Sequence, residues 1–257
     1  FGIGNKKFEK KISSKFGYKF LLNSKVNKKN LKKNFGGIDL IIHCAGSGIV
    51  GLSTALHLKK KAPNAKIVIL EKGQFPQGAS TKNAGFACFG SLSEILQDLQ
   101  SHTTEEVVEL VNQRQKGLQL LRHTLGDEAL SYQQLGGYEL FLEKDSSLYD
   151  TCLQKMKEVN SLLKPIFKDA VFSNVTNSFD FKGVQNNYIR NEFEGQIDTG
   201  KMMQELIKKV QKEGVIILNN STVETYTEQF NNVAIKTNHF EFSCAKLILT
   251  TNGFAQQ

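Results

Sequence analysis

Residues 38–71, IDLIIHCAGSGIVGLSTALHLKKKAPNAKIVILE, decide the fold that the sequence predicts. The first part, 38–45, is mostly apolar and runs into glycine, a pattern typical of a buried parallel strand. After a glycine-rich turn, residues 52–61 carry apolar side chains at helical spacing and end in lysines, which suit the negative end of a helix dipole. Pro63 breaks the helix, and residues 66–70 form a second apolar run. Strand, helix and strand in this order predict a βαβ unit.

The turn at residues 46–51, GSGIVG, matches the pattern G-x-G-x-x-G. Gly46 permits a tight turn, Gly48 lets the backbone approach a pyrophosphate, and Gly51 lets the helix pack closely on the strand. Glu71 ends the second strand, 20 residues after Gly51, where a carboxylate can accept hydrogen bonds from both hydroxyls of an adenosine ribose. The carboxylate would also repel a 2′-phosphate. The pattern therefore predicts a dinucleotide site that disfavours NADP; a glycine-rich turn without function is the alternative.

The segment at 78–85, GASTKNAG, follows within a dozen residues. Its small residues would let the backbone run close to a flat ligand, and the hydroxyls of Ser80 and Thr81 could bind phosphate. An ordinary surface loop explains the same composition equally well. The segment therefore supports a nucleotide site only in combination with the βαβ unit.

The composition limits the class of protein. The chain has 257 residues, of which 40% are hydrophobic, enough for one large domain or two small ones with a buried core. Its apolar runs fall short of the roughly 18 residues of a membrane-spanning helix. Its four cysteines lie 44 or more residues apart and form no C-x-x-C pair. We therefore expect a cytoplasmic protein with reduced thiols, and we predict neither a metal site nor a disulfide framework.

The net charge of +8 is concentrated at one end of the chain. Residues 1–34 contain eleven lysines and one acidic residue, Glu9, whereas the rest of the chain is slightly acidic. Such an arm can bind nucleic acid or anionic lipid. However, residues 1–37 contain no Ala, Thr, Asp or Gln, and the composition changes abruptly at Ile38, which favours an appendage over a working element. We expect this extension to pack loosely or not at all.

The remaining elements are predicted from periodicity and turn signals. The predicted helices are 94–100, 104–125, 148–163 and 199–212, and the predicted strands are 138–142, 179–190, 215–218, 221–227, 232–237 and 241–249. An apolar stripe on the helix at 104–125 indicates a core face rather than a partner-binding face. Its members are Val107, Val108, Leu110, Val111, Leu118, Leu120 and Leu121.

Three motifs, in this order and spacing, resemble the D-amino-acid oxidase (DAO) superfamily of FAD-dependent amine and amino-acid oxidoreductases. They are GSGIVGLSTA at 46–55, VILEK at 68–72 and GASTKNAG at 78–85. The superfamily includes glycine oxidase and sarcosine-oxidase-like enzymes. The resemblance covers residues 38–257.

Further resemblances lie downstream. Residues 136–141 look like the start of the family's substrate-domain sheet, 194–200 like the segment that returns the chain to the flavin domain, and 247–253 like the turn near the flavin diphosphate. They imply an α/β fold, with a discontinuous Rossmann-like FAD-binding domain and an inserted α+β substrate domain. The implied limits are 1–37 for the extension, 38–100 and 190–257 for the FAD-binding domain, and 101–189 for the substrate domain. Family members continue past the position of Gln257, so we expect the substrate domain to be incomplete.

The resemblance also implies the cofactor. FAD would be held without a covalent bond, since the segment 78–85 contains no histidine. Val223 matches the strand whose backbone faces the adenine in this family. The residues implied to bind FAD are Gly46, Gly48, Ile49, Gly51, Glu71, Lys72, Ala79, Ser80, Thr81, Asn83, Ala84, Gly85, Val223, Thr250 and Gly253.

The activity implied by the resemblance is oxidation of a small amine or amino acid, in which a hydride passes from the α-carbon to the flavin. The sequence shows no convincing acid–base pair, so no residue is assigned a catalytic role. Tyr138 and Arg190 could face the substrate and Cys88 could contact the flavin, but these residue types are more typical of structural positions. Two alternatives stay open: a flavoprotein domain of an RNA-modifying enzyme, for which the basic extension would matter, and a truncated FAD-binding fragment without catalysis. The amine, the electron acceptor and the oligomeric state are not specified by the sequence.

Overall fold

A computed structural model describes residues 38–43 and 46–251 of the chain, with side chains from Gly46 onward. The basic extension at 1–37 and the predicted site residue Gly253 lie outside the described residues. The fold is mixed α/β, as predicted. Among the described helices, none combines the length and the apolar composition needed to cross a membrane.

The chain forms two compact units. The first unit is discontinuous, because it combines the chain before residue 84 with the chain after residue 198. The second unit, Ala84–Asp198, is inserted between these two parts. The functional domain limits predicted at residues 100 and 190 stay predictions.

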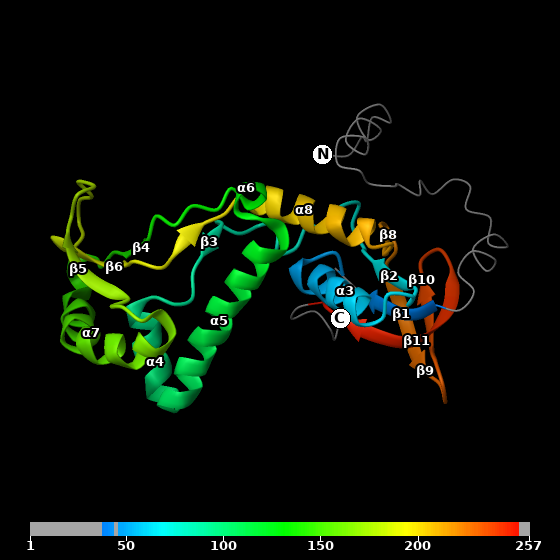
Figure 1. The fold of residues 1–257 in the computed structure, drawn as a ribbon, viewed down its shortest axis with the longest axis horizontal. Coiled ribbons are helices and arrows are strands. Elements are labelled where there is room, and N and C mark those ends of the chain that lie inside the picture. Colours follow the sequence, from blue (N-terminus) through cyan, green and yellow to red (C-terminus); the bar gives the residue numbers. More distant parts are fainter. Residues whose placement is uncertain (1–37, 44–45, 252–257) are drawn as a thin grey trace. The chain divides into compact units, whose positions relative to one another are not determined.

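The first unit is built on a six-stranded sheet with the order β8-β2-β1-β11-β10-β9 (Figure 1). Its strands are β1 (Ile38–His43), β2 (Ile67–Leu70), β8 (Ile216–Leu218), β9 (Val223–Glu228), β10 (Val233–Thr237) and β11 (Glu241–Leu249). Strands β8, β2, β1 and β11 run parallel, and β9, β10 and β11 form an antiparallel meander. His43 pairs with both Leu70 and Leu249, and Leu70 pairs with Leu218. The carboxyl ends of the four parallel strands therefore share one edge.

Two helices of the first unit, α3 (Ile49–Lys61) and α8 (Thr199–Lys212), pack against each other, and α3 also contacts β1 and β2 (Figure 1). Their buried apolar residues are Leu52, Ala55 and Leu56 in α3 and Met202, Met203, Leu206, Ile207 and Val210 in α8. A further core joins β2, β8 and the meander through Val68, Leu70, Leu218, Ile235 and Cys244. Helix α8 has the predicted bounds, whereas α3 begins at Ile49 instead of residue 52, directly after its N-cap Gly48 and thus within the G-x-G-x-x-G segment.

The second unit combines α-helices with two small antiparallel sheets (Figure 1). The helices are α4 (Leu92–Ser101), α5 (Thr104–Leu125), α6 (Asp127–Leu130) and α7 (Ser146–Phe167), with a 3₁₀ turn, η1, at Glu143–Asp145. One sheet has the order β4-β6-β5, and the other pairs β3 with β7. The strands are β3 (Phe86–Ala87), β4 (Gly137–Glu139), β5 (Phe172–Thr176), β6 (Asn187–Asn191) and β7 (Gly195–Gln196).

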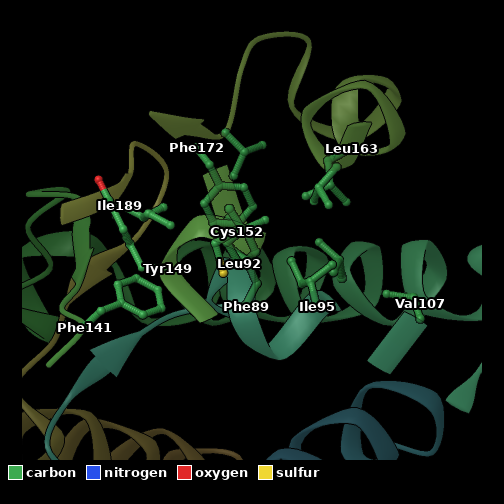
Figure 2. Packing of buried hydrophobic residues seen from close by; sticks show 13 residues of the cluster. Phe89, Leu92, Ile95, Val107, Phe141, Tyr149, Cys152, Leu163, Phe172 and Ile189 are labelled. Carbon is green, nitrogen blue, oxygen red and sulfur yellow. The ribbon is translucent and has the colours of Figure 1, made fainter. Parts of the chain in front are cut away.

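Apolar side chains from α4, α5, α7 and the β4-β6-β5 sheet form the core of the second unit (Figure 2). The core residues are Phe89, Leu92, Ile95, Val107, Val111, Phe141, Tyr149, Cys152, Val159, Leu163, Val171, Phe172 and Ile189. Capping boxes at Ser91 and Thr103 fix the starts of α4 and α5, since each hydroxyl accepts a backbone hydrogen bond from the first turn. Burial in this core raises the pKa of the Cys152 thiol to about 11, so that the thiol stays protonated at neutral pH.

The apolar stripe of α5 is buried only in part. Val107 and Val111 are buried, but Leu110 and Leu120 are 38% and 45% exposed. The core shared with α4 and α7 reaches the first turns of α5, and it does not include the apolar residues further along the helix. The prediction that the whole stripe faces the core is therefore wrong.

The strand prediction at 179–190 is also wrong over most of its length. Only the end of this segment is a strand, β6, because the residues before it fold into a loop in which Asp180 and Gly183 have positive φ (55° and 72°). Strand β5 and the short strands β3 and β7 have no counterpart among the predicted elements. Strands of two residues carry no periodicity from which they could be predicted.

Candidate functional site

The candidate site lies where the parallel strands of the first unit end. The glycine turn, residues 46–51, follows β1, Glu71 follows β2, Asn219 follows β8, and Thr250 follows β11. Strands β2 and β8 lie on one side of β1 and β11 lies on the other side, so the strand order reverses at β1. In open α/β sheets, ligands bind outside the carboxyl ends of the strands at such a switch point. The topology therefore brings the main predicted site residues to the expected edge.

The glycine turn holds the start of α3 close to the end of β1. Gly48, which has no side chain, is the N-cap of α3. At Gly51, a Cβ atom would overlap the carbonyl oxygen of Gly46 and would come within 3.1 Å of Thr250 Oγ1. Only glycine fits at this position, which agrees with the close packing predicted for Gly51. The N-terminus of such a helix is suited to bind an anion such as phosphate.

The Glu71 side chain lies against the glycine turn and is only 3% exposed. Its Oε2 accepts hydrogen bonds from Ser47 Oγ (2.6 Å) and from Ser47 N (3.3 Å). Its Oε1 accepts a hydrogen bond from Gly73 N (2.9 Å). The carboxylate predicted to bind ribose is thus fixed beside the G-x-G-x-x-G turn by donors from two segments.

The segment after β8 runs along the backbone of Glu71. Ser221 N donates to Glu71 O (2.9 Å), and Asn220 N donates to Gly73 O (3.0 Å). Val223 begins β9 two residues later, is half-buried, and packs against the core around Leu218. The strand expected to face the adenine therefore starts two residues after a segment that is hydrogen-bonded to the backbone of Glu71.

The loop 78–83 reaches the start of α3 through Ser80. Ser80 Oγ accepts a hydrogen bond from Ile49 N (3.0 Å), and a hydroxyl in this arrangement can still donate its own proton to a phosphate oxygen. Thr81 Oγ1 instead donates within the loop, to Pro76 O (3.2 Å) and Gly78 O (3.0 Å). Of the two hydroxyls predicted to face phosphate, Ser80 is thus the one that the structure places at the helix N-terminus.

The other predicted FAD-binding residues differ in their surroundings. The Asn83 side chain donates to Ala79 O (3.0 Å) and Ser80 O (3.1 Å), which closes the loop on itself. Lys72 and Ala79 are exposed. In the second unit, Ala84 is exposed, and Gly85 is buried with φ 78° and accepts a hydrogen bond from Ile197 N (2.8 Å). None of these contacts by itself indicates a ligand, and the role of each residue stays a prediction.

Two residues at the edge of the sheet have no place in the sequence-based site. Ser47 contacts Glu71 directly, but its position as the first variable residue of G-x-G-x-x-G carries no signal of that contact. Thr251 is 8% exposed, and its Oγ1 has no hydrogen-bond partner among the described residues. A buried polar atom without a partner is costly, so a ligand that supplies one is favoured here.

These residues fit the adenosine diphosphate part of a dinucleotide. Backbone can approach a pyrophosphate at the glycine turn, the α3 N-terminus and the Ser80 hydroxyl suit a phosphate, and Glu71 suits a ribose hydroxyl. Among the side chains that the structure describes, from Gly46 to Thr251, no group of three His, Cys, Asp or Glu gathers as a metal site requires.

Tyr138, Arg190 and Cys88, which could face the substrate or the flavin according to the sequence, lie in the second unit. Arg190 forms an ion pair with Glu192 (3.1 Å), and its guanidinium lies 5.8 Å from the centre of the Tyr138 ring. Tyr138 lies in β4 and Arg190 lies in β6, and the two residues pair directly in the β4-β6-β5 sheet. The Cys88 thiol is exposed, which contradicts the packing role that its residue type favoured.

Glu94, Glu139 and Glu194 surround the segment after β3 in the second unit. The Glu194 carboxylate accepts a hydrogen bond from Phe89 N (3.3 Å). Burial is the largest cause that raises the pKa of Glu194; the charges of Glu94 and Glu139 add to it, and backbone hydrogen bonds from Phe89 and Gly90 oppose it. Because the folded state binds this proton more tightly, its stabilising contribution is present below the unfolded pKa and is lost as the pH rises through the raised pKa.

Glu194→Gln is expected to remove this loss of stability. Glutamine keeps an oxygen that can accept from Phe89 N, and it places no charge near Glu94 and Glu139, so the free energy of unfolding at pH 7 should rise by up to about 1 kcal/mol. The gain should shrink as the pH falls toward the ordinary glutamate pKa of about 4.3. Urea unfolding at several pH values measures it, with the exposed Glu213→Gln as the control. A gain that is absent at pH 7 or independent of pH would contradict the assignment.

The comparisons with known proteins identify the family. The family model described as FAD dependent oxidoreductase (DAO) matches residues 45–257. The chain therefore belongs to this family, as its motifs predict. No curated protein sequence matches the chain.

Three solved structures with a similar fold have names that refer to reactions of amino acids. The L-amino acid deaminase from Proteus myxofaciens has a TM-score of 0.61 and 16% identity, with 86% of this chain and 46% of that chain covered. Glycine oxidase from Geobacillus kaustophilus has a TM-score of 0.58 and 16% identity, with 84% of this chain and 56% of that chain covered. L-proline dehydrogenase from P. horikoshii has a TM-score of 0.56 and 16% identity, with 85% of this chain and 54% of that chain covered. The present chain thus spans about half the length of these proteins. At this identity the likeness supports the fold.

Proposed function

We propose that the protein is an FAD-dependent oxidoreductase that oxidises a small amine or amino acid. The observation that carries the proposal is the Glu71 carboxylate, buried and held against the G-x-G-x-x-G turn at the carboxyl edge of the parallel sheet. The family of FAD-dependent oxidoreductases matches this part of the chain. The site and the family together support FAD as the ligand.

The adenosine diphosphate part of FAD would be held by the first unit. Glu71 accepts a hydrogen bond from the ribose, and Ser80 donates to a phosphate while Ile49 N holds its oxygen in place. Gly46, Gly48 and Gly51 keep side chains away from the pyrophosphate. The strand that begins at Val223 and the residue Thr250 would line the remaining sides in this proposal. When bound, FAD supplies the site with a hydride acceptor.

The substrate class is supported by the names of the similar structures. Those proteins are named for L-amino acids, glycine and L-proline. We extend this class to the present chain as a proposal, with the second unit as part of the substrate domain. No catalytic side chain is assigned, because hydride transfer from a neutral amine does not require an acid or base from the protein.

Anaerobic reduction of the bound flavin tests this proposal. The purified chain, loaded with FAD, is mixed with glycine, L-proline, sarcosine or longer L-amino acids, and the flavin absorption band is recorded. We expect at least one amine to bleach the band, whereas 2-methylalanine, which has no α-hydrogen, should leave it unchanged. If dithionite bleaches the band and every amine fails, the chain binds FAD without oxidising amines. A chain that takes up no FAD would contradict the whole proposal.

A further inference from the structure

Ser47 is the most buried polar residue at the site, and nothing in the sequence assigns it a role. It is 1% exposed and occupies the first variable position of the G-x-G-x-x-G turn. Its hydroxyl donates to Glu71 Oε2 over 2.6 Å, and its backbone N–H donates to the same oxygen over 3.3 Å. These two contacts join the turn after β1 to the end of β2, 24 residues away.

We propose that Ser47 is a positioning residue that fixes the Glu71 carboxylate for the adenosine ribose, and that it thereby sets the preference of the site for a ribose with its hydroxyls intact. This inference rests on the proposed binding of FAD. Ser47 acts through Glu71 and does not itself have to touch the cofactor.

The hydrogen-bond capacity of the two residues supports this role. A hydroxyl has one proton to donate, and the proton of Ser47 is used on Glu71 Oε2 at a short distance. Ser47 is therefore unlike Ser80, whose oxygen accepts from Ile49 N and whose proton can still be donated. The two serines of the site thus have different tasks, one toward the carboxylate and one toward a phosphate.

The geometry also determines which carboxylate oxygen serves the ligand. Oε2 accepts two hydrogen bonds from Ser47, which uses its two lone pairs, whereas Oε1 accepts one from Gly73 N and keeps capacity for another donor. With one oxygen tied to the turn after β1 and the other to the turn after β2, the carboxylate cannot rotate freely. A ribose hydroxyl therefore meets an acceptor that is already oriented.

Removing the hydroxyl should weaken binding selectively. In Ser47→Ala, Oε2 keeps only the long contact from the backbone N–H, so Glu71 loses a charge-assisted hydrogen bond and its fixed orientation. We expect the affinity for FAD to fall about tenfold. Of the two FAD analogues that lack the 2′- or the 3′-hydroxyl of the adenosine, the one without the hydroxyl that Oε1 binds should lose less affinity, because it does not make the contact that Glu71 offers.

The experiment titrates the full chain with FAD and with the two deoxyadenosine analogues, and follows flavin fluorescence. For wild type, we expect FAD to bind more tightly than at least one analogue. For Ser47→Ala, the ratio between the dissociation constants of that analogue and of FAD should approach one. Ser47→Thr, which retains a hydroxyl, should restore the ratio. If Ser47→Ala does not fold in a thermal melt, Ser47→Cys, with a weaker donor of similar size, replaces it under the same expectation.

The outcomes separate this inference from the proposed function. If wild type binds no FAD, the proposed function fails. If wild type binds FAD and Ser47→Ala weakens FAD and both analogues by the same factor, Ser47 only shapes the turn, and the positioning role is overturned while FAD binding stands.

Discussion

Replacing Gly51 by alanine is expected to destabilise the first unit and to weaken its binding of FAD. The added Cβ would overlap the carbonyl oxygen of Gly46, so α3 and the turn must move apart. Forcing extra atoms into a packed region costs about 1–3 kcal/mol. The shift also displaces the helix N-terminus that we propose holds the phosphate, and we expect the affinity for FAD to fall by at least about tenfold.

Gly117→Ala is the control, because a Cβ at Gly117 meets no atom within 4 Å and the residue lies in α5, outside the predicted FAD-binding segments. We expect this variant to keep the flavin content of wild type and to be at least as stable, since alanine favours a helix over glycine. Urea unfolding and the flavin content after dialysis measure both effects. A Gly51→Ala protein with the stability and the flavin of wild type would contradict the packing described for the glycine turn.

Replacing Glu71 by alanine is expected to weaken FAD binding about ten- to a hundredfold. The ribose loses a charged acceptor, and hydrogen bonds to charged groups contribute about 1.5–3 kcal/mol. The change also leaves the Ser47 hydroxyl and Gly73 N without their partner. Because the donors around Glu71 are buried, we expect a loss of stability in addition to the loss of affinity.

Fluorescence titration with FAD measures the affinity of the Glu71→Ala protein. Glu228→Ala, which removes an exposed carboxylate at the end of β9, should bind FAD as wild type does. A Glu71→Ala protein that retains all of its flavin after dialysis would show that this carboxylate does not bind the ribose.

The βαβ unit could be predicted in detail because each of its parts has a strong local signal. The apolar runs before Gly46 and before Glu71 are strands, and the bounds of α5 and α8 agree with the predicted helices. The family also followed from motifs, since residues 46–85 carry three of them in order. Such patterns arise between residues that are close in sequence, so they can be recognised without the structure.

The contacts of the site could not be predicted in the same way. The hydrogen bond between Ser47 and Glu71 depends on how the turn after β1 meets the end of β2, and serine at this position has no pattern that would reveal it. The partial exposure of the apolar stripe on α5 could not be predicted either. Apolar spacing shows that a helix has an apolar face, but it does not show how much of that face a neighbouring element covers. The particular substrate could not be predicted from the sequence, because it depends on a site that no local motif describes.

We expect the first unit to bind FAD reversibly through the glycine turn and Glu71. Three measurements on the purified full chain test this binding: a titration with FAD, the same titration in the presence of ADP, and acid precipitation of the loaded protein. We expect saturable quenching of FAD fluorescence, competition by ADP for the adenosine part of the site, and release of all flavin into the supernatant. The absence of quenching, the absence of competition by ADP, or flavin that stays with the pellet would contradict reversible binding of FAD at this site.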